Sequence, residues 1–363
     1  MQWGTLSYPA LVTELCSLYI DPELIPKKDL KGLIDRALSR FRHRDVIHLS
    51  RMKHGLNVLE LWHGVTYAFK DLSMSCTGQF LQYFLEKRQK RVTIVVGTSG
   101  DTGSSAIESV RGAKNIDIIV LLPLGHCSKI QELQMTTVIE ENVHVFGAGC
   151  IAQKMGLPIR LVTVVNRNDI IHRTVQQGDF SLSENTRSTL ASAMDIQVPY
   201  NMERIFWLLS GSDCRLVRAL MEQFDRTKEL RVPRELHAKI SETISSQSAS
   251  DEDIVQVMQR CWEENHYLLC PHSAVAVSYH YKQSTHEEPS LPRCCLAPAS
   301  AAKFQDAVLQ AQLVPEIPKD IRALEHMKTR CTTLRRGDDW TQVLRSKIED
   351  VFRQRKAGVN SQQ

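Results

Sequence analysis

Residues 92–103 read VTIVVGTSGDTG, and this stretch decides the fold. Its first five residues form a continuous β-branched run, which is typical of a strand covered on both faces. The other seven are glycines and small polar residues, and the segment 104–111 that follows reads as a helix. A buried strand that turns directly into a helix is the repeating unit of an α/β protein with a mainly parallel sheet. We therefore predict open, mainly parallel sheets with flanking helices.

The glycine-rich turn at 97–103 predicts a ligand site. Its glycines allow unusual backbone angles, and its N–H groups and hydroxyls lie at a helix N-terminus, where an anion is favoured. Ligands of open α/β sheets bind at such turns. The alternative is an ordinary turn in which Ser99, Asp101 or Thr102 only caps the helix. The turn has neither the GK[ST] of a Walker loop nor the G-x-G-x-x-G pattern of dinucleotide binding.

A lysine precedes this unit in residues 66–71, which read TYAFKD. Aromatic and small residues around Lys70 predict partial burial, which favours the neutral amine that condenses with an aldehyde. The alternative is a solvated ion pair between Lys70 and Asp71.

The alternation of strands and helices extends on both sides of the turn. Upstream we expect helices within 8–44, strands at 46–49 and 56–61, and a helix from Lys70 to Arg88. Downstream we expect strands at 116–122, 143–146 and 159–165, separated by helices at 129–139 and 151–156. Three regions follow, namely an N-terminal helical segment (1–60), an α/β core (61–170) and a C-terminal α/β and helical region (171–363). Helices in the last region are expected at 184–194, 203–209, 213–228, 234–245, 251–265 and 318–329.

Composition excludes several classes of function. The 363 residues carry a net charge of only +4 and give no argument for nucleic-acid binding. We find no apolar stretch that could cross a membrane and no ordinary signal peptide, so secretion would need another route. The ten cysteines form neither a CxxC pair nor a zinc pattern. We therefore expect a cytoplasmic protein with reduced thiols and no metal site.

The lysine loop and the turn together resemble the threonine synthase family, whose fold is that of the tryptophan-synthase β type. The resemblance is carried by Ala68-Phe69-Lys70-Asp71, Gln79 and the GTSGDTG turn, and further by residues 131–135 (QELQM) and 270–276 (CPHSAVA). It covers nearly the whole chain.

This resemblance implies pyridoxal 5′-phosphate (PLP) as the cofactor, bound covalently by Lys70. It also implies that Phe69 packs near the cofactor ring. Family members often place Thr at the position of Pro298 as a partner for the pyridine nitrogen, and Ser300 is the substitute that this chain offers. The residues expected to hold the cofactor and the substrate carboxylate are Thr98, Ser99, Asp101 and Thr102.

The resemblance also implies an activity. Threonine synthase converts O-phosphohomoserine to threonine, whereas animal relatives similar to this chain eliminate phosphate from O-phosphothreonine or O-phosphohomoserine. We expect a lyase that takes a small phosphorylated amino acid and releases 2-oxobutyrate, ammonia and phosphate, with Lys70 as the base. A homo-oligomer is compatible with this expectation.

The chain departs from the family pattern near residues 147–149. Several dozen family residues, including an Asn-Ser-x-Asn-x-x-Arg motif and the loop that holds the PLP phosphate, have no counterpart there. The pattern indicates a shortened, alternatively spliced form. An alternative function is therefore a catalytically silent form that acts as a secreted or intracellular interaction or signalling protein.

Overall fold

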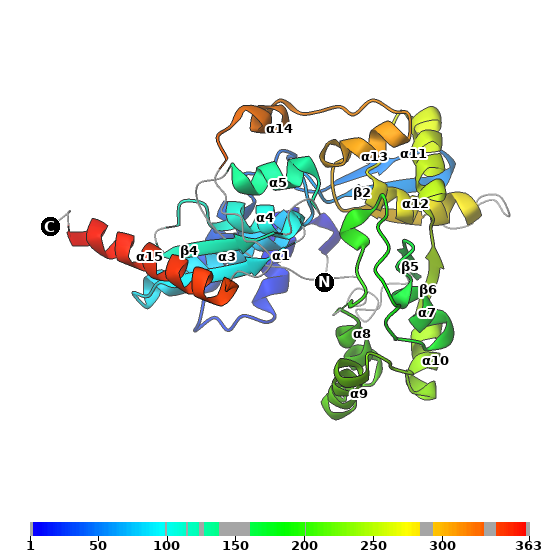
Figure 1. The fold of residues 1–363 in the computed structure, drawn as a ribbon, viewed down its shortest axis with the longest axis horizontal. Coiled ribbons are helices and arrows are strands. Elements are labelled where there is room, and N and C mark those ends of the chain that lie inside the picture. The colour runs from blue at the N-terminus through cyan, green and yellow to red at the C-terminus, as the bar shows by residue number, and fades with distance from the viewer. Residues whose placement is uncertain are drawn as a thin grey trace.

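The computed structural model describes residues 3–98, 100–113, 115–122, 127–137, 160–199, 201–283, 293–329 and 339–360. Three small sheets with flanking helices make up the described fold, and all their strand pairs but one are parallel. The predicted α/β class with mainly parallel sheets is confirmed. Figure 1 shows helices α8, α9 and α10 as a group that extends below the sheets at the right, and α15 (Trp340–Asn360) at the left.

The N-terminal segment combines two helices with the first sheet. Strand β2 (Leu56–Glu60) pairs antiparallel with β1 (His48–Arg51) and parallel with β7 (Arg293–Ala297). The strand expected from residue 46 begins only at His48, because Val46 has a positive φ of 69°. Short 3-10 turns flank this region at Trp3–Thr5 and Lys53–Gly55, and the helices are α1 (Tyr8–Ser17) and α2 (Lys27–Leu38).

The predicted core unit is present. Helix α3 (Lys70–Lys87) leads to β3 (Val92–Gly97), the glycine turn, α4 (Asp101–Val110), β4 (Ile116–Leu121) and α5 (Lys129–Thr136). Strands β3 and β4 pair in parallel from Val92↔Ile116 onward. The expectation that β3 is covered on both faces is wrong, because Val95 is 42% exposed.

The C-terminal region differs more from the expectation. No helix forms over 184–194, where only the 3-10 turn Ser192–Met194 is regular. Asp195 and Asn166 draw this segment into a side-chain network, in which Asp195 Oδ2 accepts from Thr189 N at 2.9 Å. The elements here are β5 (Leu161–Val165), α7 (Ile170–Gln177), α8 (Asn201–Leu209), α9 (Cys214–Thr227), α10 (Arg234–Thr243), β6 (Ile244–Ser248), α11 (Asp251–Asn265), α12 (Pro271–Gln283), α13 (Gln305–Gln310) and α14 (Lys319–Ala323), with 3-10 turns at Ala301–Lys303 and Leu324–His326.

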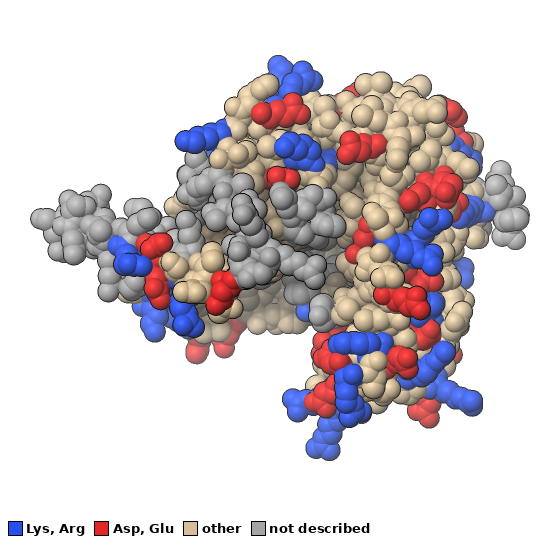
Figure 2. All heavy atoms as spheres, viewed as in Figure 1, with Lys and Arg blue, Asp and Glu red and all other residues tan. Residues whose placement is uncertain are grey.

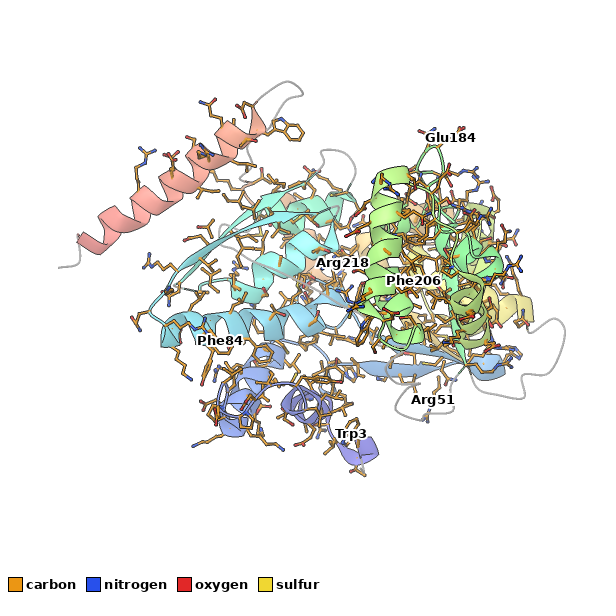
Figure 3. All side chains as sticks on the ribbon, turned by 90° about the horizontal axis from the view of Figure 1, so that it is seen from below. Trp3, Arg51, Phe84, Glu184, Phe206 and Arg218 are labelled. Atoms are coloured by element: carbon orange, nitrogen blue, oxygen red, sulfur yellow. The ribbon has the colours of Figure 1, made fainter. Side chains whose placement is uncertain are left out.

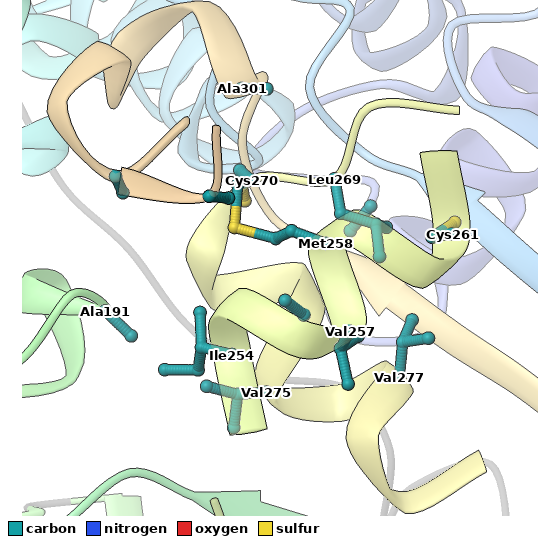
Figure 4. Packing of buried hydrophobic residues seen from close by; sticks show 14 of the residues in the cluster. Ala191, Ile254, Val257, Met258, Cys261, Leu269, Cys270, Val275, Val277 and Ala301 are labelled. Atoms are coloured by element: carbon teal, nitrogen blue, oxygen red, sulfur yellow. The ribbon is translucent and has the colours of Figure 1, made fainter. Parts of the chain in front are cut away.

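Two hydrophobic clusters hold this region together. One joins β2 and β7 to α11, α12 and α13, and Figure 4 shows Ile254 of α11 beside Val275 of α12. The other fills the group of α7 to α10, where the ring of Phe180 lies 5.4 Å from that of Phe206 and 4.7 Å from that of Phe224. Figure 3 shows Phe206 within this group, apart from Phe84 on α3.

Several expectations fall outside the described residues. They are the strand at 143–146, the helix at 151–156, the shortening near 147–149 and the role of Ser99. The division at residues 60 and 170 stays a prediction, although β2 and β7 join the first and third predicted regions in one sheet.

Candidate active site

Two distant segments pair to form the floor of the site. Phe69 N donates to Pro298 O at 2.7 Å and Ser300 N donates to Tyr67 O at 3.1 Å, on either side of a β-bridge between Ala68 and Ala299. The loop before α3 is thereby aligned with the segment that follows β7. Lys70 and the 3-10 turn Ala301–Lys303 consequently face the same space.

A fully buried ion pair lies in that space. Lys303 is 0% exposed, and its Nζ lies 2.5 Å from Asp101 Oδ1 and donates to Thr66 O at 2.8 Å. Gln131 Nε2 donates to the same Asp101 oxygen at 2.8 Å. Burial opposes ionisation of Asp101, but the charges of Lys303 and Lys70 and these hydrogen bonds lower its pKa to about 2. Asp101 is therefore a carboxylate at neutral pH.

Lys70 begins α3 and is half-buried, with its Nζ 4.7 Å from the centre of the Phe69 ring. Burial lowers the pKa of Lys70, Asp101 raises it, and Lys303 lowers it again, with a net result below the ordinary value for lysine. The predicted tendency toward a neutral, nucleophilic amine is thus supported by the surroundings of this residue.

Asp71 does not form the solvated ion pair that was the alternative for Lys70. Its carboxylate is buried and accepts from Thr66 N at 2.7 Å, from Thr66 Oγ1 at 2.8 Å and from Ser105 Oγ at 2.6 Å. Burial raises the pKa of Asp71 against these bonds. A Cβ added to Gly64 would lie 2.3 Å from Asp71 Oδ2, so glycine is needed for this close approach. Asp71 therefore fixes the loop that presents Lys70.

Thr98 caps the helix after the glycine turn. Its Oγ1 accepts from Gly100 N at 3.1 Å and from Gly103 N at 2.9 Å. Asp101 instead points to Lys303, and no side-chain capping bond comes from Gly100, the residue at the cap position. The capping role considered for Asp101 is therefore wrong, and Thr98 holds it, because its Oγ1 accepts from Gly103 N in the first turn of α4.

Other predicted site residues are near Lys70 but carry no demonstrated role. Phe69 supplies the ring beneath the Lys70 amine. Thr102 is half-buried in the first turn of α4. Ser300 Oγ accepts from Ala302 N at 3.3 Å, which leaves the hydroxyl proton to donate elsewhere. Their binding functions stay predictions.

His272 also belongs to the site, although sequence reasoning assigned it no role beyond its place in residues 270–276. Its buried ring lies 4.5 Å from the ring of Phe304, and its Nε2 accepts from Ala193 N at 3.1 Å. Burial lowers its pKa to about 4 against the pull of Asp101, and the positive charges of Lys70 and Lys303 lower it further. The ring is neutral at pH 7 and adds no charge beside Lys70.

Lys303 is the other residue that sequence reasoning missed. It follows Ala301-Ala302 and precedes Phe304, a small and aromatic setting much like that of Lys70 after Ala68-Phe69. That likeness was the available signal. Gln134 is nearby, since its Nε2 donates to Thr66 O at 3.1 Å, while its buried Oε1 has no hydrogen-bond partner within the described part of the chain.

A separate polar pocket of about 280 Å³ lies at the end of β5 and does not include Lys70. It is lined by three arginines (Arg167, Arg173 and Arg187), and Arg173 is neutralised by Asp169 and Asp179 at 3.0 and 2.7 Å. In the ranges that the structure describes, no group of three His, Cys, Asp or Glu could hold a metal ion. None of the described helices has the length and apolar composition to cross a bilayer. Acidic and basic side chains intermingle on the face shown in Figure 2.

Comparison with known proteins gives a consistent result. A family model described as threonine synthase, C-terminal, matches residues 273–345. Human threonine synthase-like 2 is 60% identical over 440 residues, which cover 100% of this chain and 91% of the human protein. Threonine synthase of Saccharomyces cerevisiae is 29% identical over 457 residues, which cover 96% of this chain and 88% of the yeast protein.

Solved structures show the same likeness. The crystal structure of threonine synthase from yeast has a TM-score of 0.87 and 27% identity, and the match covers 97% of this chain and 90% of the yeast chain. A PLP-bound threonine synthase from Brucella melitensis has a TM-score of 0.80 and 27% identity, and the match covers 91% of this chain and 86% of the other.

Proposed function

The chain belongs to the threonine synthase family, within its threonine synthase-like 2 group, and from this premise we propose that it is a PLP-dependent phospho-lyase. Its substrates would be O-phosphothreonine and O-phosphohomoserine, and its products 2-oxobutyrate, ammonia and phosphate. The cofactor assignment is supported by the PLP bound in the Brucella relative. We also propose a cytoplasmic location, with which the free state of the eight described cysteines agrees.

One observation carries the proposal. Lys70 is the first residue of α3 and is half-buried, and its pKa is lowered by burial and by Lys303 against the effect of Asp101. A neutral lysine amine in a sheltered site is the chemical requirement for reversible condensation with an aldehyde. Surface lysines keep their proton and do not meet this requirement.

The described residues fit the aldehyde end of PLP. When bound, PLP would supply an aldehyde for an amine and an aromatic ring that takes up electron density from the substrate. Lys70 would hold the aldehyde, Phe69 would support the ring, and Ser300 would donate its hydroxyl proton to the ring nitrogen. The phosphate end is expected near residues 147–149, which lie outside the described residues.

The protein groups have separate tasks in the reaction. The amine of Lys70 would be the base that takes the proton from the substrate Cα. Thr98 and Thr102 would orient the substrate carboxylate at the N-terminus of α4, where the backbone N–H groups favour an anion. Neutral His272 and the paired Asp101 and Lys303 keep the surroundings of the amine free of excess charge.

Activity is tested with the purified chain, PLP and O-phosphothreonine. We expect phosphate and 2-oxobutyrate to appear in equal amounts, each followed by its own assay. A Lys70→Ala variant should release neither, whereas Lys282→Ala, which removes a partly exposed lysine paired with Asp253, should behave like the wild type. Equal product release by wild type and Lys70→Ala would refute the proposal.

A second function is favoured by one observation. The alignment with human threonine synthase-like 2 extends over 440 residues although this chain has 363, so several dozen human residues have no counterpart here. We propose as the alternative a catalytically silent splice form that acts in interaction or signalling. In that case the folded chain would take up no PLP, and O-phosphothreonine would stay intact.

A further inference from the structure

We infer that Lys303 is a positioning residue. Its ammonium group forms an ion pair with the carboxylate of Asp101 and thereby leaves the amine of Lys70 free to react. The proposed function gives this arrangement its purpose, but the arrangement itself is a property of the chain alone.

The geometry shows which lysine takes the carboxylate. Asp101 Oδ1 receives Lys303 Nζ at 2.5 Å and Gln131 Nε2 at 2.8 Å. A third contact, from Lys303 Nζ to Thr66 O at 2.8 Å, fixes the direction of the ammonium. No ion pair with Lys70 is found within the described part of the chain, although Asp101 acts on its titration.

The charged groups that face Lys70 come from four elements. Helix α4 contributes Asp101 and the 3-10 turn Ala301–Lys303 contributes Lys303. Helix α3 itself contributes Asp71, whose oxygens are already bonded to Thr66 and Ser105. Helix α12 contributes His272, which is neutral. Asp101 is therefore the carboxylate for which the two lysines compete.

Because Asp101 and Lys303 are buried, the competition between the two lysines decides whether Lys70 keeps its proton. A buried carboxylate needs one compensating charge, and an ammonium that finds no such partner loses its proton more easily. With Lys303 in place, the site is balanced when Lys70 is neutral. Without Lys303, Asp101 would draw its counter-charge from Lys70 and keep that amine protonated and unreactive.

The test measures the reactivity of Lys70 without any cofactor. The protein is first treated with hydroxylamine and dialysed, which removes any aldehyde bound to the amine of Lys70. It is then acetylated with trace isotope-labelled acetic anhydride from pH 6 to 10. Mass spectrometry of the peptide that contains Lys70 gives the labelling midpoint. For Lys303→Met we expect the midpoint to rise by at least about one pH unit, which slows labelling at neutral pH about tenfold.

Two further variants complete a double-mutant cycle of Lys303 and Asp101. Asp101→Asn should lower the midpoint, because Lys303 then acts on Lys70 without compensation. The double variant Lys303→Met with Asp101→Asn should return close to the wild type, because both charges are gone. It also removes the unpaired buried carboxylate that could prevent Lys303→Met from folding, so the Asp101→Asn and double variants decide the question if the single variant is not folded.

Lys282→Met is the matched control. Lys282 Nζ lies 2.8 Å from Asp253 Oδ2, and this ion pair is not part of the site. It should leave the Lys70 midpoint unchanged. The inference is overturned if folded Lys303→Met labels like the wild type, or if Asp101→Asn fails to lower the midpoint. A chain with the expected midpoints that takes up no PLP would refute the proposed function and leave this inference standing.

Discussion

At the scale of single residues, Lys70 and Lys303 occupy similar local sequences but have opposite electrostatic roles. Lys70 faces an aromatic ring, and burial is the largest cause of its lowered pKa. Lys303 instead forms an ion pair with Asp101. Sequence reasoning could find Lys70 because its motif is local. It could not assign Lys303, because the partners Thr66 and Asp101 lie more than two hundred residues away in the chain.

Gly100 is a residue of the turn that has both a left-handed backbone conformation and no room for a Cβ. Its φ of +148° is a conformation that side chains with a Cβ rarely adopt, and an added Cβ would lie 2.6 Å from Gln131 Nε2. Gly100→Ala should therefore lower the free energy of unfolding by about 1–3 kcal/mol. Urea unfolding measures it, with Gly97→Ala as the control, because a Cβ there meets nothing within 4 Å. Equal stabilities of the two variants would contradict this account.

Buried histidines make stability depend on pH. Burial lowers the pKa of His272 to about 4, as it does for His280, so the unfolded chain binds more protons than the folded chain between about pH 4 and 6.5. The free energy of unfolding should fall as the pH drops through this window, by up to about 3 kcal/mol for each histidine.

His272→Asn checks this sign. The variant should lose stability less steeply between pH 6.5 and 4 than the wild type in urea unfolding at each pH. His326→Asn, which removes an exposed histidine, should keep the wild-type slope. An unchanged slope in His272→Asn would show that His272 does not contribute.

At the scale of elements, periodicity predicted helices with one buried face and failed where burial is uniform. Helix α9 was expected within one residue of its observed range, Cys214–Thr227, and buries Val217, Leu220 and Phe224. Helix α12 (Pro271–Gln283) was missed, because it is buried nearly all round and so lacks an amphipathic pattern. The helix expected at 184–194 is replaced by a loop, because the side chains of Asn166 and Asp195 form hydrogen bonds with backbone and hydroxyl groups of this segment.

The first turn of α11 offers a test of local stability. Ser250 Oγ accepts from Asp253 N at 3.2 Å, and Asp253 Oδ2 accepts from Ser250 N at 2.9 Å. This reciprocal cap predicts that Ser250→Ala lowers the free energy of unfolding by about 1 kcal/mol. Thermal or urea unfolding measures the loss, with the exposed Ser188→Ala as the neutral control. A neutral Ser250→Ala would mean that the cap contributes nothing.

At the scale of the whole molecule, sequence reasoning predicted the α/β class but not how completely each strand is covered. The β-branched run of β3 predicts two covered faces, yet Val95 is 42% exposed in a sheet with two described strands. Coverage depends on what other segments supply, and a strand's own residues do not encode it. The pairing of β2 with β7, which lies more than two hundred residues later, also depends on a distant segment and could not be predicted from either strand alone.

Cofactor binding should stabilise the whole fold. A ligand that binds only the folded state raises the free energy of unfolding by about 2.7 kcal/mol at one hundred times its Kd. We expect saturating PLP to raise the apparent Tm of the wild type and to raise that of Lys70→Ala much less. Calorimetry or dye-based melting measures the shift. Equal shifts in both proteins would place PLP binding away from Lys70.

The central claim is that Lys70 is the amine that condenses with PLP. The most direct measurement is borohydride reduction of the PLP-treated, folded chain, followed by digestion and mass spectrometry to locate the pyridoxyl label. We predict that the label is on Lys70 and that Lys303, which is 0% exposed and paired with Asp101, is unmodified. A label on Lys303 or on other lysines alone, or no label at saturating PLP, would contradict the account.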